Sequence, residues 1–306
     1  MTNEIIYIAK PTWYTEKLYP NHRRFFEKFY PQLAQYHEVR ALELPDIWVR
    51  DFFPLQNVKT GELYQHFFDL RGSYYKAKFA AAIRNQIRGV FPHAKFCDVC
   101  IEGGNIVITP DKKYAFCLEK RSIFPKSNPT KKEYVEKELK QALGVEGVFW
   151  IPKQNFLSYS RMSEYVQFLG NFLMEGSLDY EGTTTGSFLE DRGMFYDYMK
   201  NLNYYDDYHD DIVHLLCFTT NREHTRFSGG CYVNFLETSR AVFVPQLNSP
   251  EDKRALTIIQ EYTKKPIVPV DCSAFSHSGG AVYRLTREYS FSLNKYKWVF
   301  SQKLRF

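Results

Sequence analysis

Two acidic residues stand in stretches whose other residues could build a binding pocket. Asp51 lies in the stretch Asp46-Ile47-Trp48-Val49-Arg50-Asp51-Phe52-Phe53-Pro54, and Glu102 precedes a glycine pair in Glu102-Gly103-Gly104-Asn105. A buried carboxylate can hold a cationic group through charge-assisted hydrogen bonds. The simpler interpretation of both acids is a structural salt bridge, for which Arg50 is a neighbouring partner in the sequence.

Two further stretches complete the set of candidate site segments. The first is Ser276-His277-Ser278-Gly279-Gly280-Ala281-Val282-Tyr283-Arg284-Leu285-Thr286, where a glycine pair runs into an apolar segment. This pattern predicts a tight loop that leads into a buried strand, because glycine permits close backbone approach. The second is Tyr232-Val233-Asn234-Phe235, followed by Val244-Pro245-Gln246.

In this order and spacing, the four stretches resemble the agmatine deiminase and bacterial peptidylarginine deiminase family, which are guanidine-modifying enzymes of pentein fold. The resemblance runs from Asp46 to Thr286. It implies an α/β fold, a five-bladed propeller of ββαβ units, formed by a single domain over residues 1–306 with an insertion around 176–211. The alternation of helical and strand-like segments by itself favours an α/β class without choosing between a propeller and an open sheet.

The resemblance also assigns roles to residues. Enzymes of this family hold a guanidinium between carboxylates, attack its carbon with a cysteine thiolate and move protons with a histidine. Asp51 and Glu102 match the carboxylates that bind the guanidinium. Trp48 and Arg50 match the scaffold around Asp51.

Three of the family's five chemical positions are replaced in this chain. The family pattern G-G-x-x-x-C ends here in Arg284, and the pattern Gly-His-x-Asp is Ser160-Arg161-Met162-Ser163, so the histidine position is Arg161 and the second aspartate position is Ser163. Arginine stays protonated near neutral pH and therefore serves neither as a nucleophile nor as a proton shuttle. We expect a catalytically degenerate protein with a binding, regulatory or structural role, in which Arg284, Arg161 or both pair with Asp51 and Glu102 as a built-in substrate mimic.

Two other functions are compatible with the sequence. One is an active guanidine deiminase or amidine hydrolase, acting on agmatine or an arginine-type substrate, with Cys231, Cys272, Ser278 or Tyr283 as the nucleophile. The other is a metal-dependent hydrolase built on the acidic run Asp206–His214. Cys97 and Cys100 have metal-ligand spacing but lie on an expected strand, which favours core cysteines. We expect no metal and no cofactor.

Charge and composition bound the class of protein. The net charge of +5 is spread along the chain and does not indicate nucleic-acid binding. The sequence has no apolar run of bilayer length and no evident signal peptide, and its six cysteines have no framework spacing. These features predict a cytoplasmic protein without membrane association, or an effector exported by a non-classical route. The expected partner is a small guanidine, an anionic ligand or another protein, with a homodimer as one oligomeric option.

The expected elements follow from apolar periodicity, prolines and capping residues. Helices are predicted over His22–Tyr30, with Pro31 as an interruption, Ala77–Val90, Thr130–Leu143, Met194–Lys200 within the insertion, and from Ser249 to Tyr262. Strands are predicted over Ile5–Ala9, Glu38–Leu44, Tyr64–Leu70, Lys95–Ile101, Asn105–Thr109, Tyr114–Leu118, Val148–Ile151, Tyr165–Phe168, Ile212–Phe218, Cys231–Leu236, Ala241–Val244 and Pro266–Val270.

Overall fold

The chain forms a mixed α/β structure, seen in a computed structural model that describes residues 2–68, 77–119, 130–151, 163, 166–170, 172–178, 212–217, 232–275 and 280–292. The helices are α1 (Trp13–Leu18), α2 (His22–Ala34), α3 (Val49–Phe52), α4 (Ala77–Val90), α5 (Thr130–Leu143), α7 (Asp252–Glu261) and α8 (Val282–Leu285), with a 3₁₀ turn, η1, at Gly103–Asn105. The strands are β1 (Thr2–Lys10), β2 (Glu38–Glu43), β3 (Leu55–Gln56), β4 (Leu63–Phe67), β5 (Lys95–Cys100), β6 (Ile106–Ile108), β7 (Tyr114–Leu118), β8 (Gly147–Ile151), β9 (Val166–Leu169), β10 (Phe172–Leu178), β11 (Ile212–Cys217), β12 (Leu236–Glu237), β13 (Val242–Gln246), β14 (Ile267–Asp271) and β15 (Thr286–Ser292).

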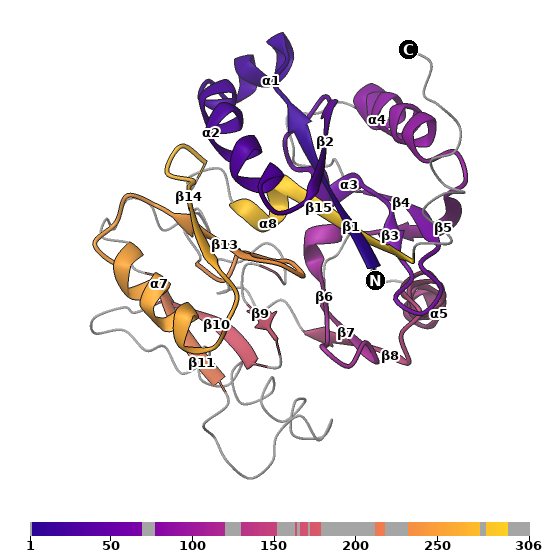
Figure 1. Cartoon of the computed structure of the whole chain (residues 1–306). Coiled ribbons are helices and arrows are strands. Elements are labelled where there is room, and N and C mark those ends of the chain that lie inside the picture. The colour runs from indigo at the N-terminus through magenta and orange to yellow at the C-terminus, as the bar shows by residue number, and fades with distance from the viewer. Residues whose placement is uncertain are drawn as a thin grey trace.

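These strands form five three-stranded sheets among the described residues, and the sheets share one pattern. In each, a first strand pairs antiparallel with a second, and the second pairs parallel with a third, as in β3-β4-β5, β6-β7-β8 and β12-β13-β14. A parallel pair needs a crossover, and α4, α5 and α7 supply it for these three sheets. The sheets are set around the middle of the molecule with these helices outside (Figure 1). This repetition of ββαβ units is consistent with the expected five-bladed propeller.

The two ends of the described chain meet in one sheet. Strand β1 pairs antiparallel with β15 from Thr2↔Ser292 to Ile8↔Thr286, and it pairs parallel with β2 on its other edge. Helices α1 and α2 lie between β1 and β2 in sequence and form the crossover of this unit. The first and last described strands therefore belong to one ββαβ unit.

Two apolar clusters fix the short helix α3. Trp48 packs with Phe25, Phe29 and Phe275 on one side, while Phe52 and Phe53 pack with Tyr7, Phe91 and Tyr289 on the other. The ring of Tyr7 lies 5.5 Å from that of Phe53 and 5.6 Å from that of Tyr289. Because α3 is held on both sides, the polar residues between these aromatic side chains have little freedom to move.

Most predicted elements are confirmed within two or three residues, and three predictions differ. Pro31 does not interrupt α2, which continues to Ala34 because Phe25, Phe29 and Leu33 bury one continuous stripe. Strand β10 extends to Leu178, and the predicted insertion around 176–211, most of which lies outside the described residues, stays a prediction. The predicted helix Met194–Lys200 lies outside the described residues.

The other two differences concern segments at the candidate site. In the predicted strand Cys231–Leu236, Tyr232 and Val233 form a turn, and only Leu236 belongs to β12, while Cys231 lies outside the described residues. The glycine pair does not lead directly into a strand, because the single-turn helix α8 precedes β15. In both places the backbone is not part of a sheet, and its residues belong to the site described below.

Candidate functional site

Two single-turn helices bring opposite charges together in the interior. Asp51 lies in α3 and Arg284 lies in α8, each helix being four residues long. Both side chains are buried, with 8% and 3% of their surfaces exposed. Nη2 of Arg284 donates to Oδ2 of Asp51 at 2.6 Å. Asp51 is thus buried and forms an ion pair with Arg284.

The surroundings of Arg284 are those of a cation site. Its guanidinium carbon lies 4.2 Å from the centre of the Trp48 ring, within the range of a cation–π interaction. The second oxygen of Asp51, Oδ1, accepts the backbone N–H of Gly104 at 3.2 Å. The carboxylate is therefore hydrogen-bonded through both oxygens, one to a guanidinium and one to a peptide N–H.

Gly280 allows this close approach. A Cβ atom at this position would lie 2.7 Å from Cζ3 of Trp48, 2.8 Å from Nη1 of Arg284 and 2.9 Å from its Cδ. Distances below 3.0 Å are not tolerated without movement of one partner, so a side chain at position 280 would push the arginine away from the ring. The second glycine of the pair is thus required by packing against Trp48 and Arg284.

Arg50 faces different partners from those of Asp51. Its Nη1 donates to Oε1 of Glu288 at 3.1 Å, its Nη2 also bonds that carboxylate, and its Nε donates to the carbonyl of Tyr283 at 2.6 Å. The Arg50 guanidinium carbon lies 3.4 Å from the centre of the Tyr283 ring. Among the described residues, the ion pair of Arg50 is therefore with Glu288, and that of Asp51 is with Arg284.

Glu288 is a residue of this network that sequence reasoning missed. Although burial opposes ionisation, the Arg50 charge lowers the pKa of the Glu288 carboxyl below its ordinary value. The only sequence signal is its position four residues beyond Arg284, at the start of a strand. Through Arg50, Glu288 holds the carbonyl of Tyr283 and hence the helix that carries Arg284.

Three side chains hold the backbone that follows Asp51. Nε2 of His66 contacts the Asp51 carbonyl at 3.2 Å, Gln65 donates to the Phe52 carbonyl at 3.2 Å, and Arg287 donates to the Pro54 carbonyl at 3.0 Å. Burial lowers the pKa of His66 to about 4, so this imidazole is neutral at pH 7. These contacts fix the direction in which α3 presents its carboxylate.

Asn234 connects the remaining segments. Its Oδ1 accepts the backbone N–H groups of Ala281 at 2.9 Å and Arg284 at 3.4 Å, and its Nδ2 donates to the carbonyl of Ser163 at 3.3 Å. Asn234 stands in one of the four quoted stretches but received no role there. Among the described residues, the buried hydroxyl of Ser163 has no hydrogen-bond partner.

Glu102 and Arg161 have different outcomes. Glu102 is half-buried and precedes η1. The backbone N–H of Gly104, in η1, donates to the Asp51 carboxylate. Gly103 lies directly against the Arg50 carbonyl, so this glycine pair, like the other, serves close packing. Arg161 lies outside the described residues, and its pairing with either carboxylate stays a prediction.

The site positions share one place in the fold. Asp51, Glu102, Ser163, Asn234 and Arg284 each stand two to four residues before the first strand of a unit, namely β3, β6, β9, β12 and β15. Five equivalent chain segments therefore enter the site at the same end of their strands. This equivalence explains how residues more than 230 positions apart form one network.

Other sequence candidates for chemistry lie elsewhere. Cys97 is buried in the core beneath α5, and burial raises the pKa of its thiol to about 12. In the parts of the chain that the structure describes, no three histidine, cysteine or acidic residues gather as metal ligands would, and no helix is both long and apolar enough to span a bilayer. The acidic run Asp206–Asp211 lies outside those parts.

Comparisons with known proteins identify relatives of this arrangement. The family model described as Porphyromonas-type peptidyl-arginine deiminase matches residues 14–289. A search of curated proteins found no match. Among solved structures, the chain is similar to agmatine deiminase of C. jejuni in a substrate-bound variant, with 14% identity, a TM-score of 0.73, and coverage of 94% of this chain and 93% of that one.

Two other solved structures agree with this result. Agmatine deiminase of Enterococcus faecalis is 17% identical with a TM-score of 0.69, covering 94% of this chain and 93% of that one. DDAH from Pseudomonas aeruginosa is 14% identical with a TM-score of 0.60, covering 94% and 100%. These similarities show the pentein fold, and the resemblance expected from the four stretches is confirmed. Because the family match spans most of its length, the chain belongs to the Porphyromonas-type peptidyl-arginine deiminase family.

Proposed function

We propose that this chain is a catalytically silent member of its family, which uses the deiminase fold for binding or regulation and closes its own guanidinium site with Arg284. The observation that carries the proposal is the 2.6 Å bond between Arg284 and Asp51 beside the Trp48 ring. Asp51 matches a carboxylate that binds the substrate guanidinium in the family. Here that carboxylate already binds a guanidinium of the same chain.

The chemistry of Arg284 supports the same proposal. An attacking group must offer a lone pair to the guanidine carbon, and a protonated guanidinium offers none. The position that matches the family's proton-transfer histidine is Arg161, which also stays protonated, and the second aspartate position is Ser163. A substrate guanidine would therefore have to displace Arg284 and would then meet neither a thiolate nor a base at the matching positions.

The alternative, an active deiminase with another nucleophile, has less support. Cys272 is fully buried, and burial raises the pKa of its thiol far above the neutral range, so it is not a thiolate at pH 7. The Tyr283 ring lies under the Arg50 guanidinium. The two remaining candidates, Cys231 and Ser278, lie outside the described residues, as does most of the run proposed for a metal-dependent hydrolase.

A turnover assay tests the proposal. Purified protein is incubated with agmatine, free arginine and an arginine-containing peptide, and both ammonia and the ureido product are measured, with the agmatine deiminase of Enterococcus faecalis as the positive control. We expect no product above a no-enzyme blank. Turnover that thiol alkylation abolishes would overturn the proposal and favour the alternative enzyme.

A further inference from the structure

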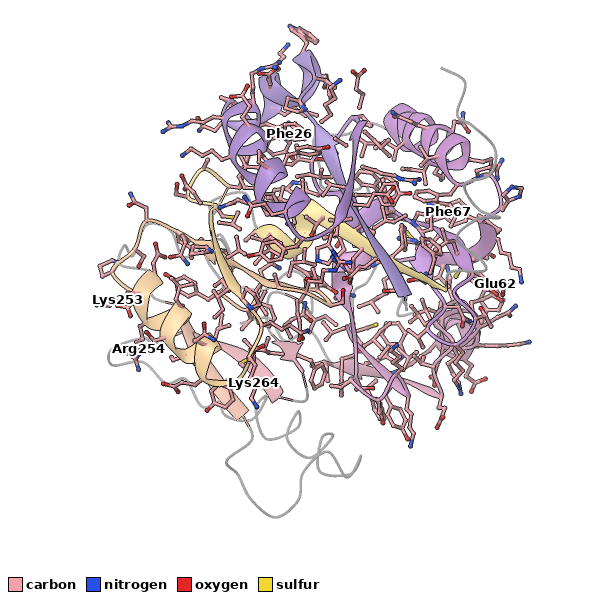
Figure 2. The ribbon with its side chains drawn as sticks, viewed as in Figure 1. Phe26, Glu62, Phe67, Lys253, Arg254 and Lys264 are labelled. Atoms are coloured by element: carbon pink, nitrogen blue, oxygen red, sulfur yellow. The ribbon has the colours of Figure 1, made fainter. Side chains whose placement is uncertain are left out.

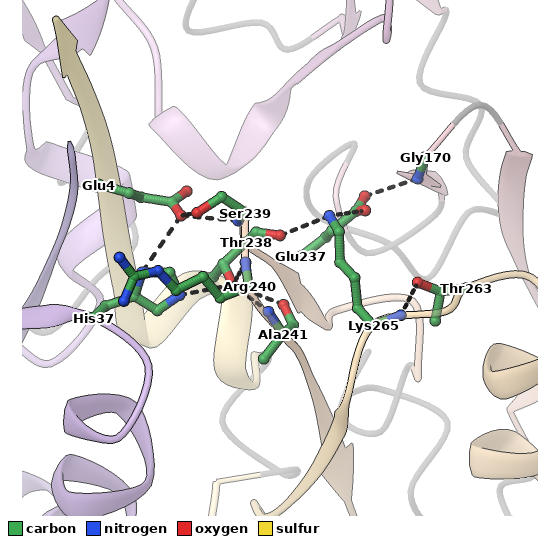
Figure 3. A network of polar contacts seen from close by, with 10 residues as sticks. All are labelled: Glu4, His37, Gly170, Glu237, Thr238, Ser239, Arg240, Ala241, Thr263 and Lys265. Atoms are coloured by element: carbon green, nitrogen blue, oxygen red, sulfur yellow. Dashed lines mark hydrogen bonds and ion pairs between the residues drawn. The ribbon is translucent and has the colours of Figure 1, made fainter. Parts of the chain in front are cut away.

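A buried glutamate and a buried histidine face each other where two of the strand units meet. Glu4 lies on β1, His37 lies directly before β2, and both contact the turn at residues 238–241 between β12 and β13 (Figure 3). Their side chains are 10% and 1% exposed. Neither residue has a role in the function proposed above.

The hydroxyl of Thr238 determines which nitrogen of His37 carries a hydrogen. Its Oγ1 lies 2.7 Å from the carbonyl oxygen of Ala241, a distance at which two oxygens need a hydrogen between them. The single hydroxyl hydrogen is therefore donated to that carbonyl, and Oγ1 is left as an acceptor. Nε2 of His37, at 2.9 Å from Oγ1, must then be the donor. Burial lowers the pKa of His37 to about 4, so the imidazole is neutral at pH 7 and its Nδ1 carries no hydrogen.

Nδ1 of His37 faces an oxygen of Glu4. The distance from Nδ1 to Oε2 is 3.5 Å, which is longer than a normal hydrogen bond between nitrogen and oxygen. When the carboxylate is ionised, the two atoms present lone pairs to each other, which is unfavourable in an interior of low dielectric constant. One proton between them converts this contact into a hydrogen bond.

The charges that face Glu4 also favour a protonated carboxyl. Glu288, on the neighbouring strand β15, is a like charge, and Lys265 is an opposite one. The Lys265 ammonium is bound by Glu237 at 2.7 Å, and its effect on Glu4 is smaller than that of Glu288. Burial has the largest effect and raises the pKa of the Glu4 carboxyl above its ordinary value.

Two residues of the turn act on the pair in different ways. Ser239 donates its backbone N–H at 2.8 Å and its hydroxyl at 2.7 Å to Oε2 of Glu4, which favours the ionised carboxylate but does not outweigh burial. Arg240 is the cation that faces His37, and its charge opposes protonation of the imidazole. An added proton is therefore held by Glu4 and donated to Nδ1, and His37 stays neutral.

We propose that Glu4 and His37 form a proton-binding site that makes the contact between β1 and the β12–β13 turn depend on pH. With the proton bound, the carboxyl O–H of Glu4 donates to Nδ1 of His37, and Nε2–H of His37 donates to Thr238. Hydrogen bonds then connect β1, the residue before β2 and the turn after β12 without interruption. Without the proton, the link between Glu4 and His37 is lost, and the direct bonds from Ser239 remain.

The test compares urea unfolding of the full chain at pH 5.0 and pH 8.0 for the wild type and Glu4→Gln. Glutamine has the shape of glutamate, does not titrate and can donate an amide N–H to Nδ1. A proton bound more tightly in the folded state stabilises the wild type at low pH, and this contribution is lost as the pH rises through the raised pKa of Glu4. The urea midpoint of Glu4→Gln relative to that of the wild type should therefore increase from pH 5.0 to pH 8.0. The histidines titrate in both proteins, so their effect cancels in this difference.

The matched control is Glu62→Gln. Glu62 lies at the outside of the molecule (Figure 2) and accepts from the Lys95 ammonium at 2.7 Å. A neighbouring cation favours the ionised form of an exposed carboxylate, so removal of that charge costs as much or more at high pH. The midpoint of Glu62→Gln relative to the wild type should therefore stay constant or decrease from pH 5.0 to pH 8.0.

A second measurement uses the wild-type protein and does not depend on the stability of Glu4→Gln. Nuclear magnetic resonance of ¹⁵N-labelled histidine distinguishes the two neutral forms of the ring, and backbone assignment identifies the signals of His37. We expect a hydrogen on Nε2 and none on Nδ1 at pH 8.0. The ring of His37 should stay neutral down to pH 5.0, because the proton is taken up by Glu4.

Either of two results would overturn the proposal. One is a midpoint of Glu4→Gln, relative to the wild type, that is constant or decreases from pH 5.0 to pH 8.0, as an ionised carboxylate held by Ser239 would give. The other is a hydrogen on Nδ1 of His37, which would make the imidazole the donor to an ionised Glu4. Neither measurement depends on turnover or on agmatine, so this proposal and the proposed function fail independently.

Discussion

At the scale of single residues, the pair of Arg284 and Asp51 combines two unfavourable groups into a stable contact. Each charge alone would lose its hydration on burial, whereas together they form a charge-assisted bond in an interior that screens it little. A buried ion pair adds little to the free energy of unfolding compared with apolar side chains of similar size, but removal of one partner lowers that free energy strongly. This asymmetry makes Asp51 a sensitive position.

Replacement of Asp51 should therefore destabilise the protein strongly. Asp51→Asn keeps the shape but leaves the Arg284 charge buried without its carboxylate, which costs on the order of 3–5 kcal/mol. The measurement is the free energy of unfolding in urea.

The matched control for Asp51→Asn is Glu43→Gln, which removes an exposed ion pair with Lys10 at 3.5 Å and should cost less than about 1 kcal/mol. If both variants lowered the free energy of unfolding by the same small amount, the ion pair of Asp51 with Arg284 would contribute no more than an exposed one, which would contradict the prediction.

Restoring the family's nucleophile should not restore its reaction. Arg284→Cys supplies a thiol, but positions 161 and 163 still lack the histidine and aspartate that the family uses. We expect no ammonia and no ureido product from agmatine. Measurable turnover by Arg284→Cys alone would contradict our assignment of the missing base.

The sequence predicts part of this network and not the rest. Asp51, Trp48 and Arg284 stand in recognisable stretches, so their proximity follows from the family resemblance. The pairing of Arg50 with Glu288 does not follow from that resemblance. It depends on the register of β15 with β1, in which Glu288 lies opposite Ile6. Sequence position alone cannot supply that register.

At the scale of elements, the glycines decide how closely the segments pack. Gly280→Ala should destabilise the protein and disturb the contact of Arg284 with Trp48, since the added Cβ would lie 2.7 Å from the ring. Overpacking of this kind costs about 1–3 kcal/mol. The thermal midpoint and the fluorescence of the tryptophans measure the two effects.

Gly89→Ala provides the matched control for Gly280→Ala. A Cβ at Gly89, in α4, meets no atom within 4 Å, and alanine favours a helix over glycine by about 1 kcal/mol. We expect the control to be neutral or stabilising. A Gly280→Ala variant as stable as this control would show that the glycine is not required by packing.

The elements around the site were harder to predict than the long helices. The helices α4 and α5 have the predicted bounds, because fourteen residues give a clear helical period. A helix of four residues, such as α3 or α8, is barely more than one turn and shows no period. The glycine pair correctly indicated close approach, but the following apolar run did not distinguish a helical turn from a strand.

At the scale of the whole molecule, three buried histidines in distant parts of the sequence make the stability of the protein depend on pH. His22 joins α2 to the Ala9 carbonyl and to Thr15, His37 contacts Thr238, and His66 contacts Asp51. Burial lowers the pKa of each to about 4, compared with about 6.5 for an exposed histidine. All three are therefore neutral in the folded protein at pH 7.

Stability should fall as the pH decreases from 6.5 to 4. In that window the unfolded chain binds protons at these histidines and the folded chain does not, so the free energy of unfolding decreases. The raised pKa of Glu4 acts in the opposite direction but is a single group. Urea unfolding at pH 7.5, 6.0 and 5.0 measures the slope, and His22→Gln should reduce it. A stability that is constant across this range would contradict the burial of the three histidines.

The five three-stranded sheets among the described residues were predictable in kind, but the pairing of the first described strand with the last was not. Alternating strands and helices indicate the units, and the resemblance indicates their number. The pairing of β1 with β15 joins residues near both ends of the sequence, and no local pattern encodes such a contact. The same strand pairing brings Arg284, which precedes β15, close to Asp51 in the first part of the chain.

The central claim, that the Arg284 guanidinium occupies the guanidinium site, is tested most directly by the thermal midpoint of Arg284→Ala with and without agmatine. Removal of the side chain should destabilise the protein and leave a site that agmatine can fill. Millimolar agmatine should then raise the midpoint of Arg284→Ala by about 2 °C or more, and leave the wild-type midpoint unchanged because its site is occupied. An agmatine effect of equal size on both proteins, or no effect on either, would contradict the claim.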